Sequence, residues 1–154
     1  MSTIIKLLPY QIPHAWEAIK LAAVRSQEVS PSALPEVCQR LLHELLSDTV
    51  QCFLSLDDDR TILQIALTQV QVHRITGQKE LVVTGLYSFR LMQDNDALEC
   101  MTLFRQVAQS QGCSRIVAGS RNARLWKLYE NLGFREASRN YVYLMEGSNG
   151  QQQV

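Results

Sequence analysis

The sequence has no long apolar run, no paired-cysteine motif and no excess charge of either sign. None of its apolar stretches approaches the roughly 20 residues that a helix needs to cross a bilayer. No such run follows the first lysine, as it would in a secretory signal. We therefore expect no membrane partner.

The charges balance. Lysine and arginine together number 15, as do aspartate and glutamate, so the formal net charge is zero. A protein that binds nucleic acid or an anionic surface through its overall field needs a positive excess. The composition therefore gives no signal for nucleic acid.

Cysteine and histidine offer little for metal chemistry. Cys38, Cys52, Cys100 and Cys113 each fall in an apolar segment, and no two of them form a CxxC pair. The three histidines also lack the spacing of metal ligands. We interpret the cysteines as reduced core residues of a cytoplasmic protein and predict that no metal is bound.

The chain has 154 residues, of which 46% are hydrophobic and 19% charged. These values predict one globular domain with an adequate core and no need of disulfides. We place that domain at residues 1–146. The remaining residues, 147–154, are rich in Gly, Ser, Asn and Gln and predict a polar tail without regular structure.

Hydrophobic periodicity and turn residues divide the domain into strands and helices. Strands are predicted at 3–8, 51–56, 61–76, 80–90, 114–119 and 137–146, and helices at 13–27, 35–46, 96–111 and 122–132. The resulting order is β-α-α-β-β-β-α-β-α-β. It predicts an α/β fold of the α+β type, with a central twisted mixed sheet and helices on both faces.

The segment Asn122-Ala-Arg-Leu-Trp-Lys-Leu-Tyr129-Glu-Asn-Leu-Gly133-Phe134 is the most distinctive part of the chain. Together with the element order, it resembles the fourth-helix signature of the GNAT (N-acetyltransferase) superfamily. The resemblance extends over most of residues 3–146. Its physical logic is an asparagine cap, a tyrosine two helical turns later, and a glycine that permits a left-handed helix end.

The resemblance implies an acyl-CoA site. It implies that Asn122 and the backbone of Leu86, Tyr87 and Ser88 contact the pantetheine arm. In an active enzyme, Tyr129 would be the general acid. From the residues alone, Asn122 is equally explained as a helix cap and Tyr129 as a half-buried aromatic residue.

The loop that should hold the cofactor's pyrophosphate departs from the family pattern of Gln/Arg-x-x-Gly-x-Gly/Ala. It aligns with residues 92–97, where only Ala97 fits, and no glycine occurs between Gly85 and Gly112. We predict that Asp96 and Glu99 form a capping box, which would occupy the amides that a phosphate needs. Two aspartates in the loop would also repel a phosphate. Acetyl-CoA binding is therefore in doubt, although Arg90, Arg121 or Arg124 could restore it.

Other catalytic candidates are few. Glu80 and Glu99 are the carboxylates near the expected cleft, and each is more typical of a surface or capping residue than of a base. Ser88 and Ser120 lie near strand ends but have no histidine at a readable spacing.

Two hypotheses follow. In the first, the chain is a degenerate GNAT-like protein that works by binding or as part of an assembly, as a homo-oligomer or with other protein chains. Leu86–Arg90 and Ser120–Asn122 show a weak likeness to proteins of tailed bacteriophages, which would place it in a virion instead of the cytoplasm. In the alternative, it is an active acyl-CoA-dependent N-acyltransferase of an unknown amine.

Overall fold

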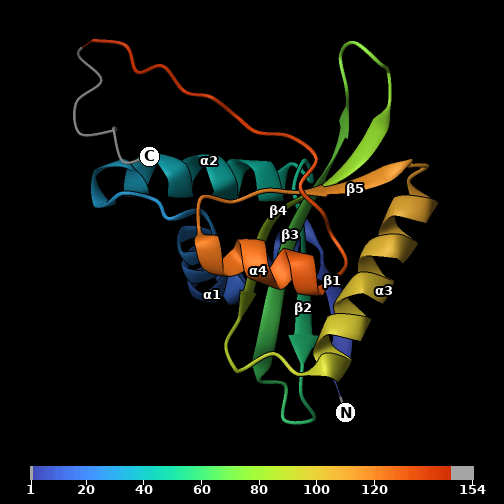
Figure 1. Ribbon diagram of the computed structural model, residues 1–154. Coiled ribbons are helices and arrows are strands. Elements are labelled where there is room, and N and C mark those ends of the chain that lie inside the picture. Colours follow the sequence, from blue (N-terminus) through green and yellow to red (C-terminus); the bar gives the residue numbers. More distant parts are fainter. Residues whose placement is uncertain (1, 147–154) are drawn as a thin grey trace.

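The computed structural model describes residues 2–146, which form one five-stranded sheet flanked by four α-helices (Figure 1). The strands lie in chain order, β1-β2-β3-β4-β5. The first four are antiparallel, and β5 is parallel to β4. The predicted mixed sheet with helices on both faces is confirmed.

The boundaries agree closely with the hydrophobic pattern. The strands are β1 (Thr3–Leu7), β2 (Gln51–Leu56), β3 (Ile62–Val72), β4 (Lys79–Ser88) and β5 (Arg115–Ala118). The helices are α1 (Ile12–Gln27), α2 (Leu34–Leu46), α3 (Asp94–Ser110) and α4 (Ala123–Asn131). Short 3-10 turns at Pro9–Gln11 and Pro31–Ala33 lead into α1 and α2. Both turns begin at proline, whose fixed φ suits a first helical turn.

Two apolar layers cover the sheet. The residues of α1 and α2 pack with Cys52, Leu54 and Leu67 on one face, and those of α3 and α4 pack with Phe53 and Ala66 on the other. Successive strand residues point to opposite faces, so β2 and β3 are apolar at consecutive positions. This explains why their sequences do not alternate cleanly.

The pairing of β3 with β4 is irregular at one point. The pairing of β3 with β4 shifts between Leu67 and Thr68, because β4 has one extra residue there. That residue is Thr84, which stands between the pairs Val83–Thr68 and Gly85–Leu67. A bulge of this kind bends the strand and changes the direction of its backbone groups.

The last predicted strand, over residues 137–146, does not form. After α4 the chain runs past β5 and away from the body of the molecule (Figure 1). All residues from Arg135 to Glu146 are exposed. The physical reason is the lack of a partner, since a strand is stable only when a neighbouring strand completes its ladder of hydrogen bonds.

No helix within residues 2–146 combines the length and the hydropathy that a membrane crossing requires.

Candidate functional site

The ends of β4 and β5 form a fork. The two strands pair only from Glu80–Arg115 to Val83–Ala118. Beyond that point β4 continues to Ser88 without β5, paired only with β3. The bulge residue Thr84 lies directly after the last pair. Backbone groups of β4 beyond this point have no β5 partner, so they are free to bind something else.

The first of these groups are bound by the end of α1. The hydroxyl of Ser26 accepts a hydrogen bond from the N–H of Leu86 at 3.2 Å and lies 3.1 Å from its carbonyl oxygen, to which it can donate. The same hydroxyl contacts the carbonyl oxygen of Ala22, one turn earlier in α1. Ser26 is only 1% exposed. The buried serine therefore accepts from the N–H of Leu86, and its single hydroxyl proton is shared between the carbonyls of Ala22 and Leu86.

The next residue of α1 reaches both sides of the fork. The side-chain amide of Gln27 donates to the carbonyl of Thr84 on β4 and to that of Gly119, which follows β5, the latter at 3.4 Å. A single side chain thus connects the two strand ends at the point where they separate.

The loop between β5 and α4 is bound to α1 in the same way. Asn122 caps α4 by accepting from the N–H of Arg124 at 3.0 Å, and its amide donates to the carbonyl of Arg25 at 3.2 Å. The Ser120 hydroxyl donates to the carbonyl of Ser26 and accepts from the N–H of Asn122 at 3.0 Å. Asn122 is therefore a cap, as predicted, but its amide is also committed to α1.

The start of α3 corrects one expectation. The helix begins at Asp94, so the reciprocal cap involves Gln93 and Asp96 and not Asp96 and Glu99. Asp96 accepts from the N–H of Gln93 at 2.9 Å and from Arg90 at 2.8 Å. Its side chain is 4% exposed. The predicted capping box was displaced by one turn, because the helix starts two residues earlier than its apolar pattern suggested.

This arrangement places a buried carboxylate in the loop aligned with the pyrophosphate loop of the family, directly after Asn95, which stands at the first glycine of that pattern. Arg90 is directed to that carboxylate, so it is committed to Asp96 in this conformation. A pyrophosphate at the same amides would meet Asp96 at short range, and opposing that repulsion would require Arg90, whose side chain is 43% exposed, to leave its pair with the buried carboxylate.

Tyr129 is a residue of α4, and its side chain lies in the apolar layer between the sheet and helices α3 and α4. It is 5% exposed, its ring centroid is 5.5 Å from that of Phe134, and its hydroxyl has no hydrogen-bond partner among the described residues. Burial raises the pKa of Tyr129 to about 12, and the neighbouring Cys100 contributes in the same direction. The phenol therefore keeps its proton at any ordinary pH. Tyr129 is thus buried, not half-buried as the alternative interpretation expected.

The two carboxylates considered as bases have structural partners. Glu80 accepts from both Nε and Nη2 of Arg115, at 2.9 and 2.5 Å, and so ties the start of β4 to β5. Glu99 accepts from the hydroxyl of Ser2 at 2.6 Å and from the amide of Asn95 at 3.3 Å. Neither carboxylate is placed as a free base.

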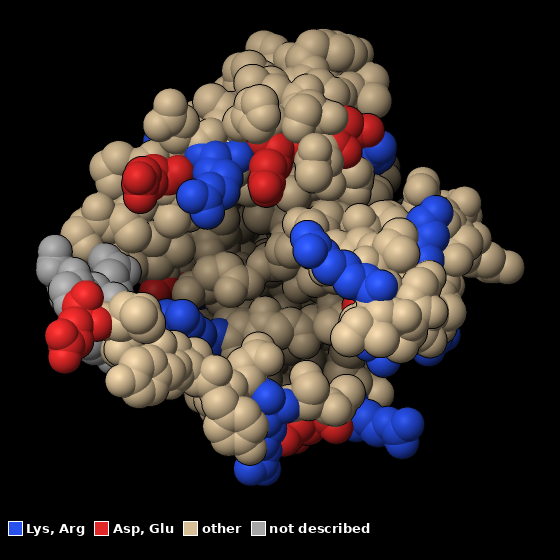
Figure 2. Space-filling view, turned by 90° about the horizontal axis from the view of Figure 1, so that it is seen from above, with Lys and Arg blue, Asp and Glu red and all other residues tan. Residues whose placement is uncertain are grey.

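A hollow of about 220 Å³ lies on the α1–α2 side of the fork, between those helices and the sheet. Its lining includes Gln27 and Thr84, together with Arg40, Glu44 and Gln69. The end of the molecule that carries α2 is visibly hollowed, with Lys and Arg side chains around the opening (Figure 2). The lining thus offers charged groups from Arg40 and Glu44 and side-chain amides from Gln27 and Gln69 to a small polar molecule. The hollow lies on the opposite side of the sheet from Tyr129.

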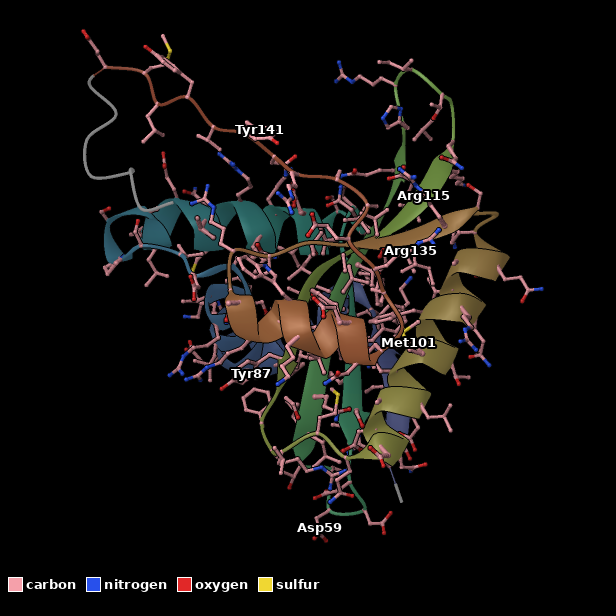
Figure 3. All side chains as sticks on the ribbon, in the orientation of Figure 1. Asp59, Tyr87, Met101, Arg115, Arg135 and Tyr141 are labelled. Atoms are coloured by element: carbon pink, nitrogen blue, oxygen red, sulfur yellow. The ribbon has the colours of Figure 1, made fainter. Side chains whose placement is uncertain are left out.

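The other residues that the resemblance implied are distributed over both faces of the sheet. Leu86 packs into the α3–α4 layer with Tyr129, whereas Tyr87 packs toward α1 (Figure 3). The Ser88 hydroxyl donates to the carbonyl of Arg90 in the turn after β4. The Ala97 N–H donates to the carbonyl of Gln93 at 3.1 Å, as a normal helical bond.

Sequence reasoning missed the contribution of α1. Ser26 and Gln27 were treated as the polar end of a helix. One signal was present: Ser26 follows Ala22 by four residues, so it continues the apolar face of α1 and had to be buried. A buried serine needs partners, which here are the groups of Leu86.

Comparisons with known proteins support the fold. No protein-family model and no curated protein matches the sequence. The described fold superposes on a ribosomal-protein-alanine N-acetyltransferase from Brucella melitensis biovar Abortus 2308, with a TM-score of 0.69, 16% identity, and coverage of 94% of this chain and 99% of that one. A predicted acetyltransferase from Clostridium acetobutylicum, determined with acetyl-CoA, gives a TM-score of 0.69 at 14% identity, covering 94% of this chain and 96% of that one.

A third similar structure is the aminoglycoside antibiotic 6'-N-acetyltransferase AAC(6')-Ih from Acinetobacter baumannii. Its TM-score is 0.65 at 14% identity, with 94% of this chain and 98% of that chain covered. The architecture is thus that of an acetyltransferase domain. More specifically, the chain has the GNAT fold, as the resemblance of residues 122–134 implied. The weak likeness to phage proteins gains no support from these comparisons.

Residues 2–146 contain no cluster of histidine, cysteine and acidic side chains that could hold a metal ion.

Proposed function

We propose that this protein is a GNAT-fold binding or assembly protein that does not transfer an acyl group from CoA. The observation that carries the proposal is the contact of Ser26 with Leu86. If the pantetheine arm lies against β4 at Leu86, as the resemblance implies, its amides need the N–H that Ser26 already accepts from and the carbonyl that the same hydroxyl contacts. Binding the arm would then require the end of α1 to give up buried hydrogen bonds, which is costly.

Three further features point the same way. Asn122, the second expected contact of the arm, donates its amide to Arg25. Gln27 spans the fork between Thr84 and Gly119. The buried carboxylate of Asp96 stands in the loop expected to hold the pyrophosphate. The residues of this chain therefore do not fit CoA in the way the family's site does.

Isothermal titration calorimetry with acetyl-CoA and with free CoA tests the proposal. We expect no saturable heat up to about 1 mM ligand, which corresponds to a binding free energy weaker than about −4 kcal/mol. A CoA-binding acetyltransferase in the same buffer is the positive control. Amide chemical shifts in the presence of CoA guard against a binding reaction with little heat. A dissociation constant below about 100 μM would contradict the proposal.

The second candidate is an acyl-CoA-dependent N-acyltransferase, and Tyr129 is the observation that favours it. Its buried hydroxyl has no partner in the described part of the chain, and burial raises its pKa to about 12, so it carries a proton that a leaving thiolate could accept. Release of CoA thiol from acetyl-CoA in the presence of a panel of amines would reveal this activity. Loss of that release in Tyr129→Phe, with unchanged binding of acetyl-CoA, would assign the role to the phenol.

The most specific version of the binding proposal is that the protein is a component of a virion. It rests on the local likeness of Leu86–Arg90 and Ser120–Asn122 to phage proteins alone. Detection of the chain by mass spectrometry in purified particles would support it, and its presence only in the soluble lysate would remove it.

A further inference from the structure

The hairpin formed by β3 and β4 projects from the body of the molecule (Figure 1). The pairing of β3 with β2 ends at Thr68, whereas its pairing with β4 continues to Val72. The outer part of β3, Gln69–Val72, therefore has β4 on one side and, within residues 2–146, no strand on the other. Residues 71–78 are all exposed. An open strand edge of this kind is a template for another strand.

This edge lacks the features that usually prevent strand addition. Protein edges are commonly blocked by a charged side chain or a proline, and Gln69–Val72 contains neither. His73 donates its N–H to Gln78 within the hairpin at 2.8 Å. Because the bonds of an antiparallel ladder alternate, the N–H groups of Val70 and Val72 are directed to the open side. Two donors and their neighbouring carbonyls are thus free to pair with a second strand.

The turn of the hairpin holds a large apolar side chain in the solvent. Ile75 is 90% exposed. The N–H groups of Ile75 and Thr76 both donate to Nδ1 of His73 at 3.3 Å, and the Gly77 N–H donates to the His73 carbonyl at 2.8 Å. Since the turn is ordered by its own hydrogen bonds, a partner that covers Ile75 loses little affinity to the ordering of this loop.

The hollow of about 220 Å³ beside α2 is a complementary surface of the same chain. It opens at the end of the molecule from which the hairpin projects (Figures 1 and 2). Its apolar lining includes Val29, Val37, Leu41, Val50 and Leu67. Glu44, the acid of this lining, has no ion-pair partner among the described residues, although Arg40 lies one turn before it on α2. Arg74, next to Ile75, is also without an ion pair there.

We infer that two copies of this chain form a two-fold dimer in which the outer parts of β3 pair antiparallel and Ile75 of each copy enters the hollow of the other. With Gln71 on the two-fold axis, Val70 of one copy lies opposite Val72 of the other, and their outward N–H groups meet carbonyls across the axis. The same register carries each turn past Thr68 of the other copy, to the part of β3 that lines its hollow.

Symmetry and charge agree with this arrangement. Each copy supplies one hairpin and one hollow, so a two-fold axis satisfies both copies at once and assembly stops at the dimer. Arg74 arrives with Ile75 at the hollow, where it supplies an ion-pair partner for Glu44. The inference gives the assembly role proposed above a definite partner, but it depends on no property of the acyl-CoA site. The calorimetry described there and the experiments below can therefore fail separately.

The first experiment measures mass and amide protection together. Light scattering of the full chain should give a dimer at about 100 μM and no larger species. Hydrogen exchange should be slow at the amides of Val70 and Val72 in the dimer and fast after dilution to the monomer. A monomer at about 100 μM, or a mass that continues to grow with concentration, would overturn the inference. So would a dimer in which these two amides exchange freely.

Matched substitutions test the contact of the turn. Ile75 and Leu91 are each 90% exposed in the single chain, so a serine at either site should leave the monomer folded, which thermal unfolding checks. Ile75→Ser should weaken self-association at least about tenfold, because it removes an apolar side chain that dimerisation buries. Leu91→Ser, in the loop after the far end of β4, should leave it unchanged. Equal effects of the two substitutions, or no effect of either, contradict the contact.

An exchange of charges tests which surface receives the turn. Arg74→Glu and Glu44→Arg should each weaken self-association about fivefold, because each places like charges together in the dimer. The double variant Arg74→Glu/Glu44→Arg should recover most of the original affinity. A double variant that associates no better than the single ones would show that the turn does not reach the hollow, and the proposed dimer would then be wrong.

Discussion

Ser26 and Leu86 are 60 residues apart in sequence, yet one hydroxyl lies within 3.2 Å of both backbone polar atoms of Leu86. The contact joins the last turn of α1 to β4 at the point where β5 separates from it. In this chain β4 has no β5 partner beyond Val83, which leaves a strand edge open. Here a side chain of the same protein closes it.

The first prediction concerns that closure. Ser26→Ala should lower the free energy of unfolding by about 1–3 kcal/mol, because it leaves the buried N–H of Leu86 without its acceptor and removes the donor shared by the carbonyls of Ala22 and Leu86. Urea denaturation followed by tryptophan fluorescence measures the change. Ser32→Ala, at an exposed position between α1 and α2, should change it by less than about 0.5 kcal/mol. Equal stability of the two variants would show that the Ser26 contact contributes nothing.

The second prediction concerns the buried carboxylate at the start of α3. Asp96→Ala should cost about 1–2 kcal/mol, since it removes the acceptor for the Gln93 N–H and the partner of Arg90. Arg90→Ala should also destabilise the protein, because it leaves a buried carboxylate unpaired. The double variant should lose less than the two single losses combined.

Thermal or urea unfolding of the three variants gives this coupling, which we expect to be at least about 0.5 kcal/mol. Asp94→Ala is the control, since Asp94 is exposed in the first turn of the same helix. Additive losses from Asp96→Ala and Arg90→Ala would mean that the two side chains do not act together.

The sequence was sufficient for the fold but only partly sufficient for the site. Periodicity located the helices because α1 to α4 each bury one face, and Asn122 and Gly133 marked the ends of α4 as predicted; Gly133 has φ of +100°. The absence of glycine from the loop at residues 92–97 could also be read from the sequence, because it depends on local composition alone. What periodicity cannot show is which distant element satisfies a backbone group, so Ser26, Gln27 and the ion pair of Arg90 were missed.

The strand predicted at 137–146 shows a different limit. The aromatic and β-branched residues in Tyr-Val-Tyr-Leu-Met favour a strand, but a strand exists only where a neighbour completes it. The local sequence therefore indicates which conformation the segment prefers, but it does not show whether another strand lies beside it. The exposure of Tyr141 and Tyr143 in the single chain is the consequence.

The third prediction is a dependence on alkaline pH. Burial raises the pKa of Tyr129 from 10.0 to about 12, so the folded protein holds this proton more tightly than the unfolded chain does. The contribution of this proton to the free energy of unfolding is therefore fully present below pH 10. It is lost as the pH rises toward 12, by roughly 1.4 kcal/mol for each unit of pKa difference. Tyr129→Phe should remove this part of the slope, and its unfolding free energy at pH 8 should be equal or slightly higher, because an unpartnered hydroxyl is lost.

Absorbance at 295 nm provides the direct check. Tyr129 should ionise near pH 12, and Tyr129→Phe should remove that step from the titration. Tyr10→Phe is the control, since Tyr10 is 72% exposed, and it should leave the step near pH 12 in place. If the step lost in Tyr129→Phe lies near pH 10, the phenol is solvated and the buried position is wrong.

The fourth prediction concerns two polar side chains that face each other across β2 and β3. Ser55 pairs with Gln64 in register, both are buried, and neither Ser55 Oγ nor Gln64 Nε2 has a hydrogen-bond partner among the described residues. Both line a small cavity of about 20 Å³ under α3. Replacing both by apolar residues of similar shape, as in Ser55→Ala/Gln64→Met, should raise the free energy of unfolding by about 1–2 kcal/mol, because two unmet polar groups disappear.

The matched control is Gln51→Met in the same strand. The Gln51 amide donates to the carbonyl of Asp48 at 2.7 Å, so its loss should destabilise the protein slightly, the opposite sign from Ser55→Ala/Gln64→Met. Urea denaturation at pH 7 measures both. A loss of stability in Ser55→Ala/Gln64→Met would contradict the prediction and would mean that a bound water joins the two side chains, since a cavity of this size can hold one.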